Sequence, residues 1–472
     1  MKPTDLPPDF SLEALSVDIS AEANQCVACG LCLPHCPTYR ITQSEADSPR
    51  GRIALMSGVA EKRIPMNERF ALHMDRCLTC RACEAACPNQ VRFGRLMDGA
   101  RAMLAAPPSD LPKEKTGARK SWFRRWVESQ LIAKPDRIDA LRPLLRFYQR
   151  RGVQSAVRRF GLLGQTKLGL LEAQLPHIAK PCSLSAQTSS AGSWRQLYPS
   201  IGRPRGEVGL FLGCVARLTD AETLNAAIWV LNHLGYVVHV PPAQTCCGAL
   251  HQHGGDMQAA ARLAHENSMA FDELNLGAII STASGCGVQL AEHSFPSALQ
   301  QSRNPRPLLQ KAEKNVVQDS LQGKPVRKLM AKVVDMSAFL AAAEGWDDVK
   351  LTPLTHKILV HEPCSLRNVL RGAAHPYSVL ERIPGAVIEP LEGNDQCCGA
   401  AGTYFLDQPE MASILLRDKI SALNVSGARY LATSNVGCAM HIASALREAG
   451  SAIEVVHPAT LIARQMGMGA QS

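Results

Sequence analysis

Cysteines at short, regular gaps are the residues of this chain whose type and spacing predict chemistry. A first run, Cys26–Pro37, follows the pattern C-x2-C-x2-C-x3-C-P, and a second run, Cys77–Pro88, repeats it. Thiolates at this spacing wrap a loop around an iron–sulfur cluster, and the proline behind the fourth cysteine turns the backbone away. Two such runs therefore predict two [4Fe–4S] clusters close enough to exchange electrons.

The fourth cysteine of each run is expected to reach the cluster of the other run, as in two-cluster ferredoxins. The resulting ligand sets are Cys26, Cys29, Cys32 and Cys87 for the first cluster, and Cys77, Cys80, Cys83 and Cys36 for the second. Zinc is the competing interpretation, because C-x2-C pairs also bind zinc. Two four-cysteine runs, each closed by Cys-Pro, favour iron–sulfur clusters.

The C-terminal half contains a different cysteine pattern, and it occurs twice. Each copy has one cysteine, then a Cys-Cys-Gly triplet, then one more cysteine. The copies are Cys214, Cys246, Cys247 and Cys286, followed by Cys364, Cys397, Cys398 and Cys438. Corresponding cysteines are 150, 151 and 152 residues apart, which indicates an internal duplication.

Four thiolates suffice for an additional iron–sulfur cluster or for a closed zinc site, and a cysteine geometry without metal is the third alternative for each copy. Adjacent cysteines face one metal only where the backbone turns sharply, which Gly248 and Gly399 favour. Four histidines lie near these cysteines in the sequence, namely His251, His253, His361 and His441. They are ligands, proton carriers or structural residues, and single histidines are more often structural. Cys182, outside all four groups, is interpreted as an ordinary thiol.

The elements around the two N-terminal runs are expected to be helical. Forty residues separate Cys36 from Cys77, too many for the short link of a compact bacterial ferredoxin. Ser48 before Pro49 predicts a helix start, and a second helix is expected over residues 67–75.

Two arginines follow Pro49 on the first of these helices. Arg50 and Arg52 either offset the negative charge of a thiolate-bound cluster, which would raise its potential, or lie on the helix surface.

The duplicated half alternates strands with helices. In the first copy we expect strands at 208–212, 236–240 and 278–282, with helices at 220–234 and 257–274. In the second copy we expect strands at 358–361 and 430–433, with helices at 375–383 and 410–423. This order predicts mostly parallel α/β sheets whose strand ends place the cysteines on one rim.

Between the two cysteine regions lies a basic helical stretch. Residues 101–180 hold 17 Lys and Arg against six Asp and Glu, an excess of +11 in a chain whose net charge is +9. The charge is either a solvated helix face or a docking surface for an acidic partner or an anionic membrane. Nucleic acid is not expected as a partner, because no nucleic-acid motif accompanies the charge.

Length and composition bound the remaining possibilities. The 472 residues, with 46% hydrophobic and 20% charged side chains, are typical of a globular protein of about three domains. Residues 1–20 lack the pattern of a secretory signal, and no run of about 18 apolar residues indicates a membrane span. We therefore expect a cytoplasmic protein whose membrane contact, if any, is peripheral on the inner face of the cell membrane.

The predicted fold class is a multidomain α/β protein with a helical ferredoxin-like domain at its start. The expected domains are a 2×[4Fe–4S] ferredoxin-type domain at 1–100, a basic helical connector at 101–205, and cysteine-rich domains at 206–345 and 355–466. Neither G-x-G-x-x-G nor G-x4-G-K-[ST] stands in a context that predicts a nucleotide or flavin site. Electrons must then come from a partner that carries such a cofactor.

Several segments of the sequence resemble the glycolate oxidase iron–sulfur subunit family. They are Cys26–Pro37, Pro49–Arg52, Asp75–Cys80, Thr282–Gly287 and Cys397–Tyr404. The duplicated pattern is similar to the cysteine-rich CCG domain of heterodisulfide reductase subunits and of lactate dehydrogenase iron–sulfur subunits. In heterodisulfide reductase the motif closes with C-x2-C, whereas Ala283 and Asn435 stand here in place of the first closing cysteine.

The resemblance implies an electron-transfer subunit without catalytic residues of its own. Such a subunit takes electrons from FAD-containing dehydrogenase subunits that oxidise glycolate, a 2-hydroxy acid, and passes them towards a quinone. The alternatives are the equivalent subunit of a D-lactate or glycerol-3-phosphate dehydrogenase, a heterodisulfide-reductase-like enzyme, and a scaffold whose C-terminal cysteines are inert.

Overall fold

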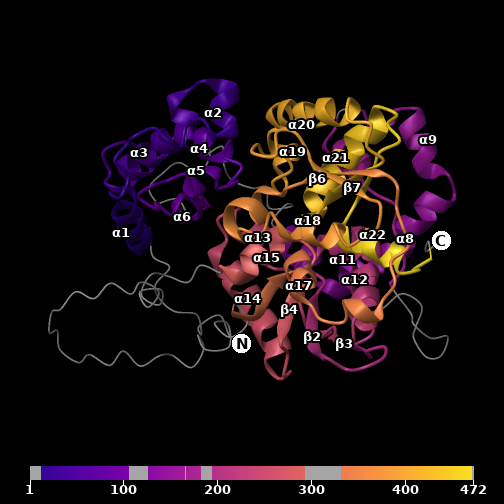
Figure 1. The fold of residues 1–472 in the computed structure, drawn as a ribbon. Helices are drawn as coiled ribbons and strands as arrows, with labels where there is room; N and C mark the ends of the chain where they lie inside the picture. Colours follow the sequence, from indigo (N-terminus) through magenta and orange to yellow (C-terminus); the bar gives the residue numbers. More distant parts are fainter. Residues whose placement is uncertain (1–11, 106–125, 165, 182–193, 293–330, 470–472) are drawn as a thin grey trace, which may run out of the picture.

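A helical unit and two α/β layers, joined by connector helices, make up the fold in Figure 1. The structure, a computed structural model, describes residues 12–105, 126–164, 166–181, 194–292 and 331–469. The arrangement confirms the predicted multidomain α/β class with a helical ferredoxin-like unit. Cys182 lies outside the described residues.

The helical unit holds the two N-terminal cysteine runs. Its helices are α1 (Leu12–Ala23), α2 (Pro37–Thr42), η1 (Glu45–Asp47), α3 (Pro49–Ala60), α4 (Glu68–Asp75), α5 (Ala82–Ala85) and α6 (Phe93–Ala105). The predicted start of α3 is confirmed, because the Ser48 hydroxyl accepts a hydrogen bond from the Gly51 amide. Asn67 caps α4 in the same way. Met56, Met74 and Met97 lie at the centre of the core beneath the cysteine loops.

The connector is helical, as expected, and it packs against both α/β layers. Its helices are η2 (Glu128–Ile132), α8 (Pro135–Arg150), α9 (Val153–Arg159) and α10 (Lys167–Gln174). Arg142 of α8 is 2% exposed and donates hydrogen bonds to the carbonyls of Ala179 and Arg217. Asp139 balances its charge. Part of the basic excess is therefore internal, and it fastens the connector to the first layer.

The first α/β layer is a five-stranded sheet of order β1-β3-β2-β4-β5. Its strands are β1 (Leu197–Tyr198), β2 (Gly206–Phe211), β3 (Tyr236–His239), β4 (Ala278–Ser281) and β5 (Val333–Asp335). Its helices are α11 (Val215–Thr219), α12 (Ala221–His233), α13 (Ala249–Gln252), α14 (Met257–Asp272), α15 (Ser284–Ala291) and α17 (Met336–Ala342). Among its described strands, β1 alone pairs antiparallel, so the expected mostly parallel sheet is confirmed.

The second layer is a four-stranded parallel sheet of order β7-β6-β8-β9. Its strands are β6 (Lys357–His361), β7 (Val387–Pro390), β8 (Tyr430–Thr433) and β9 (Glu454–Val456). Its helical segments are η5 (Trp346–Asp348), η6 (Ser365–Val369), α18 (His375–Leu380), α19 (Tyr404–Asp407), α20 (Pro409–Asn424), α21 (Val436–Glu448) and α22 (Pro458–Gln465). The two layers therefore repeat one plan, as the cysteine spacing predicts.

The two repeats share one hydrophobic core rather than folding as separate units. Leu210 and Ile228 of the first repeat belong to the same buried cluster as Ile358, Val360 and Ile462 of the second. Helix α22 of the second repeat packs on α12 of the first. This shared core fixes the two cysteine rims relative to each other.

Candidate metal centres

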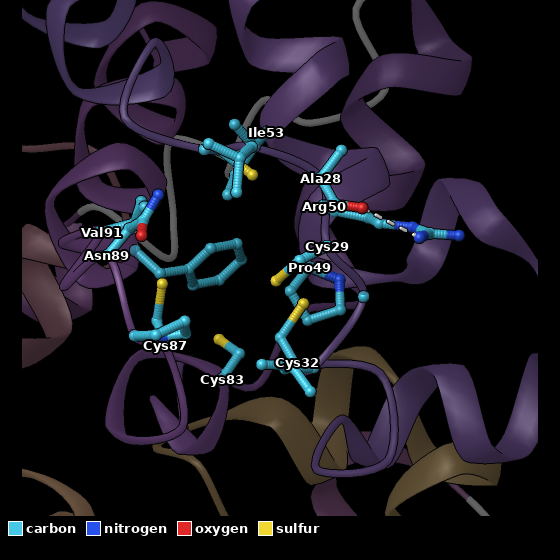
Figure 2. Close-up of a pocket in the computed structure, with 16 residues that line it drawn as sticks. Ala28, Cys29, Cys32, Pro49, Arg50, Ile53, Cys83, Cys87, Asn89 and Val91 are labelled. Atoms are coloured by element: carbon cyan, nitrogen blue, oxygen red, sulfur yellow. Dashed lines mark hydrogen bonds between the residues drawn. The ribbon is translucent and has the colours of Figure 1, made fainter.

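The first cysteine-lined pocket lies between the two N-terminal runs. Its lining includes Cys26, Cys29, Cys32, Cys83 and Cys87. Figure 2 shows the labelled cysteines among these turned towards one space, with Ile53 and Val91 beside them. The pocket encloses about 460 Å³, including space open to solvent. Cys87 of the second run therefore lies in the same pocket as Cys26, Cys29 and Cys32 of the first run, as the predicted ligand set of the first cluster requires.

A second pocket adjoins the first. Its lining includes Cys36, Cys77, Cys80 and Cys83, the four cysteines of the second predicted ligand set. Cys83, Pro49 and Phe93 line both pockets, so the two sites share a wall. Burial raises the pKa of the Cys80 and Cys83 thiols. Cysteines gathered so closely and so deeply ionise readily only when a cation compensates their charge.

Both cysteine loops bend at matching positions. Ala28 and Thr79, which each precede the second cysteine of a run, have left-handed φ values of 54° and 52°. Gly30 and Arg81, which each follow that cysteine, have φ values of 84° and 57°. The bend aims backbone amides at sulfur, and the Thr79 amide lies 3.4 Å from Cys77 Sγ. Such amide contacts stabilise a thiolate-bound cluster.

A buried ion network supports the second pocket. Asp47, which is 0% exposed, pairs with Arg52 at 3.4 Å, His73 at 2.9 Å and Arg76 at 3.0 Å. Arg52 also places Nη1 4.0 Å from Cys36 Sγ. Arg52 is 1% exposed and is therefore not a helix-surface residue, whereas its effect on the potential of a cluster stays a prediction.

The outer arginine has a different role. Arg50 pairs with Glu45 at 2.6 Å and donates to the Ala28 carbonyl at 3.2 Å, the contact drawn in Figure 2. It therefore braces the first cysteine loop from the surface side.

In the first C-terminal repeat the four cysteines form a contiguous row. Cys214 and Cys246 have their Sγ atoms 3.3 Å apart, and Cys247 contacts Cys286. Gly248, with a φ of 90°, makes the sharp turn expected behind the cysteine pair. The contact with Cys246 and burial together raise the pKa of Cys214 well above its ordinary value.

In the second repeat the row is repeated with one addition. Cys364 and Cys397 have their Sγ atoms 4.0 Å apart, and Cys398 contacts Cys438. Gly399 turns the chain with a φ of 86°. The imidazole of His361 joins this row at the end of β6, where sequence reasoning left its role open.

The other three histidines named from the sequence do not belong to the donor group that His361 forms with Cys398 and Cys438. His253 pairs with Asp98 of the helical unit at 3.1 Å, and His441 contacts Gln174 of the connector at 2.8 Å. Burial lowers the pKa of His441 to about 4, so its imidazole is neutral at pH 7. These two histidines join parts of the molecule, and His251 is buried in α13.

The second pocket abuts the second repeat. Leu78 packs in one buried cluster with Cys397 and Tyr404, and Cys80 and Cys364 border that cluster. The Asn368 amide donates to the Cys80 carbonyl at 2.8 Å. The Cys364 thiol also contributes to the raised pKa of Cys80, after burial. A centre at the second pocket therefore has the cysteine row of the second repeat as its neighbour.

Several functional residues of these sites were missed by sequence reasoning. Asp47, His73 and Arg76 approach one another only through folding, so no local pattern marks them. Lys419 could have been found by comparing the two repeats. When α20 is aligned with α14, Lys419 stands where the first repeat has the neutral residue Asn267. It is 1% exposed and faces Cys397 and Cys398.

Comparisons with known proteins agree with this architecture. Residues 22–91 match the 4Fe-4S dicluster domain, residues 208–291 and 358–443 match the cysteine-rich domain, and residues 119–175 match the linker region of the glycolate oxidase iron-sulfur subunit. The chain is 32% identical to the probable glycolate oxidase iron-sulfur subunit of Bacillus subtilis, over 94% of each chain. It is 29% identical to the glycolate oxidase iron-sulfur subunit of Escherichia coli, over 94% of this chain and 95% of that one.

A more distant relative matches only part of the chain. The lactate utilization protein A of Oceanobacillus iheyensis is 26% identical, over 53% of this chain and 94% of its own length.

Fold, cysteine sites and comparisons together define an iron–sulfur oxidoreductase subunit that joins a two-cluster domain to duplicated cysteine-rich domains. Within that class, the chain belongs to the glycolate oxidase iron–sulfur subunit family. The resemblance predicted from the sequence is thereby confirmed. None of the helices in the described ranges is long and apolar enough to cross a membrane.

Proposed function

We propose that this chain is the electron-transfer subunit of a flavin-dependent glycolate dehydrogenase. FAD-containing partner subunits oxidise the 2-hydroxy acid, and this chain carries the electrons towards a quinone. The observation that carries the proposal is the pair of adjoining pockets that share Cys83, Pro49 and Phe93. Two centres separated by one layer of side chains exchange electrons efficiently, as an electron-transfer subunit requires.

The two pockets support the ligand sets that the cysteine pattern predicts. Cys26, Cys29, Cys32 and Cys87 hold the first [4Fe–4S] cluster, and Cys77, Cys80, Cys83 and Cys36 hold the second. Each cluster, when bound, accepts and releases one electron. The protein supplies the surroundings that set its potential, namely the amide of Thr79 and the buried guanidinium of Arg52.

The two pockets differ in exposure, which suggests a direction for electron flow. Val27 and Leu31, within the first cysteine run, are 68% and 58% exposed, and Cys29 is exposed as well. Exposed apolar side chains around a cofactor are typical of a docking site for a protein partner. We therefore place the flavin subunit at the first pocket, so that electrons move inward to the second pocket and the second repeat.

The eight C-terminal cysteines are proposed to bind metal in both repeats, as an additional iron–sulfur cluster or as zinc. The set comprises Cys214, Cys246, Cys247, Cys286, Cys364, Cys397, Cys398 and Cys438. Buried thiols in contact, as at Cys214 and Cys246, are stable without metal only in protonated form. A bound cation releases these protons and compensates the thiolates, so the donor set fits a metal.

The connector is proposed to meet the inner face of the cell membrane, close to the quinone. On it, Leu144, Phe147, Phe160 and Leu168 are between 57% and 71% exposed among arginines. Basic segments with exposed aromatic and aliphatic side chains bind anionic lipid surfaces. The expected test is sedimentation of the full chain with phosphatidylglycerol vesicles, and pelleting that Phe147→Asp and Phe160→Asp leave unchanged would contradict this contact.

The electron-transfer role is tested with the complex purified anaerobically together with its flavin subunits. Glycolate should reduce a dye acceptor, and electron paramagnetic resonance should show reduced clusters. Cys26→Ser and Cys77→Ser should each lower dye reduction at least tenfold, whereas Cys182→Ser, outside all four cysteine groups, should not. Full activity in both ligand variants would refute the proposal.

Substrate choice is tested with the same preparation. We expect glycolate to be oxidised faster than D-lactate or glycerol 3-phosphate, because the near full-length relatives are named for glycolate oxidase. Iron content separates the cluster assignments, since two cubanes account for about eight irons per chain. Iron above that number would come from the C-terminal repeats.

A further inference from the structure

The second cysteine-rich repeat contains a nitrogen donor among its sulfur atoms. One ring nitrogen of His361 and the Sγ atoms of Cys398 and Cys438 all lie within 4.8 Å of one another. All three side chains are buried, and the imidazole is 2% exposed. In the part of the chain that the structure describes, no other three His, Cys, Asp or Glu side chains bring their donor atoms so close together.

The first repeat has no such donor at the equivalent position. The sheet registers identify the equivalence, because His361 of β6 pairs with Thr433 of β8, and Phe211 of β2 pairs with Ser281 of β4. The two pairs occupy the same rung of the duplicated sheet. A phenyl ring cannot bind a metal as a ligand, so the two repeats differ in chemistry at this rung.

A hydroxyl orients the imidazole towards the sulfur atoms. Nδ1 of His361 lies 2.9 Å from Thr433 Oγ1, so Nε2 is the nitrogen left for a metal. A partner on the second ring nitrogen is the usual way in which a ligating histidine is held in place. Asn435, which stands where a related motif has a cysteine, accepts a hydrogen bond from the Gly437 amide through Oδ1 and caps α21. That oxygen is therefore already engaged.

The three donor atoms, all within 4.8 Å of one another, are close enough to converge on one ion after small side-chain movements. With bonds of about 2.0–2.3 Å, tetrahedral ligands on zinc lie about 3.3–3.8 Å apart, and no two ligands exceed about 4.6 Å. Thiolates on a cubane bind different irons and must stand wider apart. Cys397 contacts Cys398, but its sulfur does not belong to the group of donors within 4.8 Å of one another, so a water molecule would complete a tetrahedral ion.

We propose that the second repeat binds a single tetrahedral ion of the zinc class through His361, Cys398 and Cys438. The first repeat, with Phe211 on the matching rung, has sulfur ligands alone. Each thiol releases its proton to solvent as it binds the ion. This inference rests on the proposed metal-binding role of the C-terminal cysteines and adds the ligand set and class of ion.

The test uses the full chain, expressed with iron and zinc and purified anaerobically. We expect about one zinc per chain, and zinc-edge X-ray absorption should show imidazole scattering beside sulfur. His361→Phe, which installs the residue of the first repeat, should lower the zinc content by about one ion per chain and leave iron unchanged. His361→Cys should keep zinc and lose the imidazole signal. Phe211→His is the matched control and should leave the zinc of the second repeat in place.

Each contrary result has a distinct meaning. Zinc retained in His361→Phe, or absorption by sulfur ligands alone in the unaltered chain, overturns the histidine ligand. Iron above about eight per chain that Cys398→Ser removes would preserve the metal-binding role of the repeat and overturn the single ion. Zinc absent and iron at about eight would overturn both proposals at once. The X-ray absorption measurement uses the unaltered chain, so the proposal can be contradicted even if a variant fails to fold.

Discussion

The two cysteine-rich repeats have the same fold but different sites. Their strands share one register and one cysteine order, yet matching positions carry Phe211 and His361, and Asn267 and Lys419. Asn267 holds its loop with neutral hydrogen bonds to the Thr245 amide and the Cys246 carbonyl. Lys419 instead brings a buried positive charge to the cysteine pair of the second repeat.

The repeats also meet the helical unit differently. The second repeat contacts the cysteine loop of the second pocket through an apolar cluster that contains Leu78 and Tyr404. The first repeat contacts α6 through polar groups, chiefly Asp98 with Gln252 and His253. The duplication thus produced two similar rims: the second meets the second pocket through apolar packing, whereas the first meets it through the ion pair between Arg81 and Glu292. Differences between copies identify function better than the shared motif does.

The largest effect is expected from breaking the apolar contact. Leu78→Ala should lower the free energy of unfolding of the helical unit by about 3–4 kcal/mol, because a buried leucine loses its contacts and leaves a cavity. Asp98→Asn, at the contact with the first repeat, should cost about 1–2 kcal/mol. Loss of cluster absorbance in urea reports both changes. An Asp98 variant as unstable as the Leu78 variant would show that the two contacts are equivalent.

Opposite responses to pH are the next expected difference. Helices α17 and α22 occupy matching places, but Asp335 caps the first and His457 caps the second. Burial raises the pKa of Asp335 to about 6 from 3.8, and burial lowers the pKa of His457 to about 4 from 6.5. The aspartate therefore contributes stability at low pH that is lost as pH rises from about 4 to 6. The histidine contributes stability at neutral pH that is lost as pH falls from about 6.5 to 4.

These two contributions oppose each other in the unaltered chain. Asp335→Asn should make the chain more sensitive to acid, and His457→Asn should make it less sensitive, each by about 2–3 kcal/mol between pH 4 and 7. Asparagine retains a cap in both variants, which isolates the titration. Urea denaturation at several pH values measures the slopes. Slopes that shift in the same direction in both variants would contradict the assignment.

Much of this fold was predictable because the sequence repeats itself. The offset of about 150 residues and the alternating apolar segments predict the duplicated parallel layers, and the strand at Tyr430–Thr433 was placed correctly to the residue. The short strands β1, β5, β7 and β9 were missed. Two to four residues at the edge of a sheet carry too little periodicity to be recognised, since tertiary pairing determines their conformation.

The candidate sites were predictable only in part, for a related reason. Regular spacing marked the cysteines, and both N-terminal ligand sets line pockets as expected. Nothing local marked the position of His361 within reach of Cys398, or of Asp47 beside Arg52, His73 and Arg76. Such contacts arise when distant segments pack, so they become visible in the structure alone.

A smaller effect is expected from the buried lysine. Lys419→Met removes a positive charge that faces the thiolates of the second repeat, so zinc should leave for a chelator about tenfold faster, equivalent to about 1.4 kcal/mol. Lys419→Arg keeps the charge and should stay within about threefold of the unaltered chain. A colorimetric chelator measures the rate. Equal rates of zinc loss in the methionine variant and the unaltered chain would show that the charge of Lys419 does not contribute to the difference between the repeats.

The smallest effect is expected where charge is most exposed. Arg40 of α2 pairs with Asp418 of α20 at 2.6 Å, but the two side chains are 41% and 52% exposed. Water and salt screen such a pair, so a double-mutant cycle with Arg40→Ala and Asp418→Ala should give a coupling below about 1 kcal/mol that fades at high salt. A coupling that approaches the cost of Leu78→Ala and persists in salt would mean that ion pairing, rather than apolar packing, holds the cluster site against the second repeat.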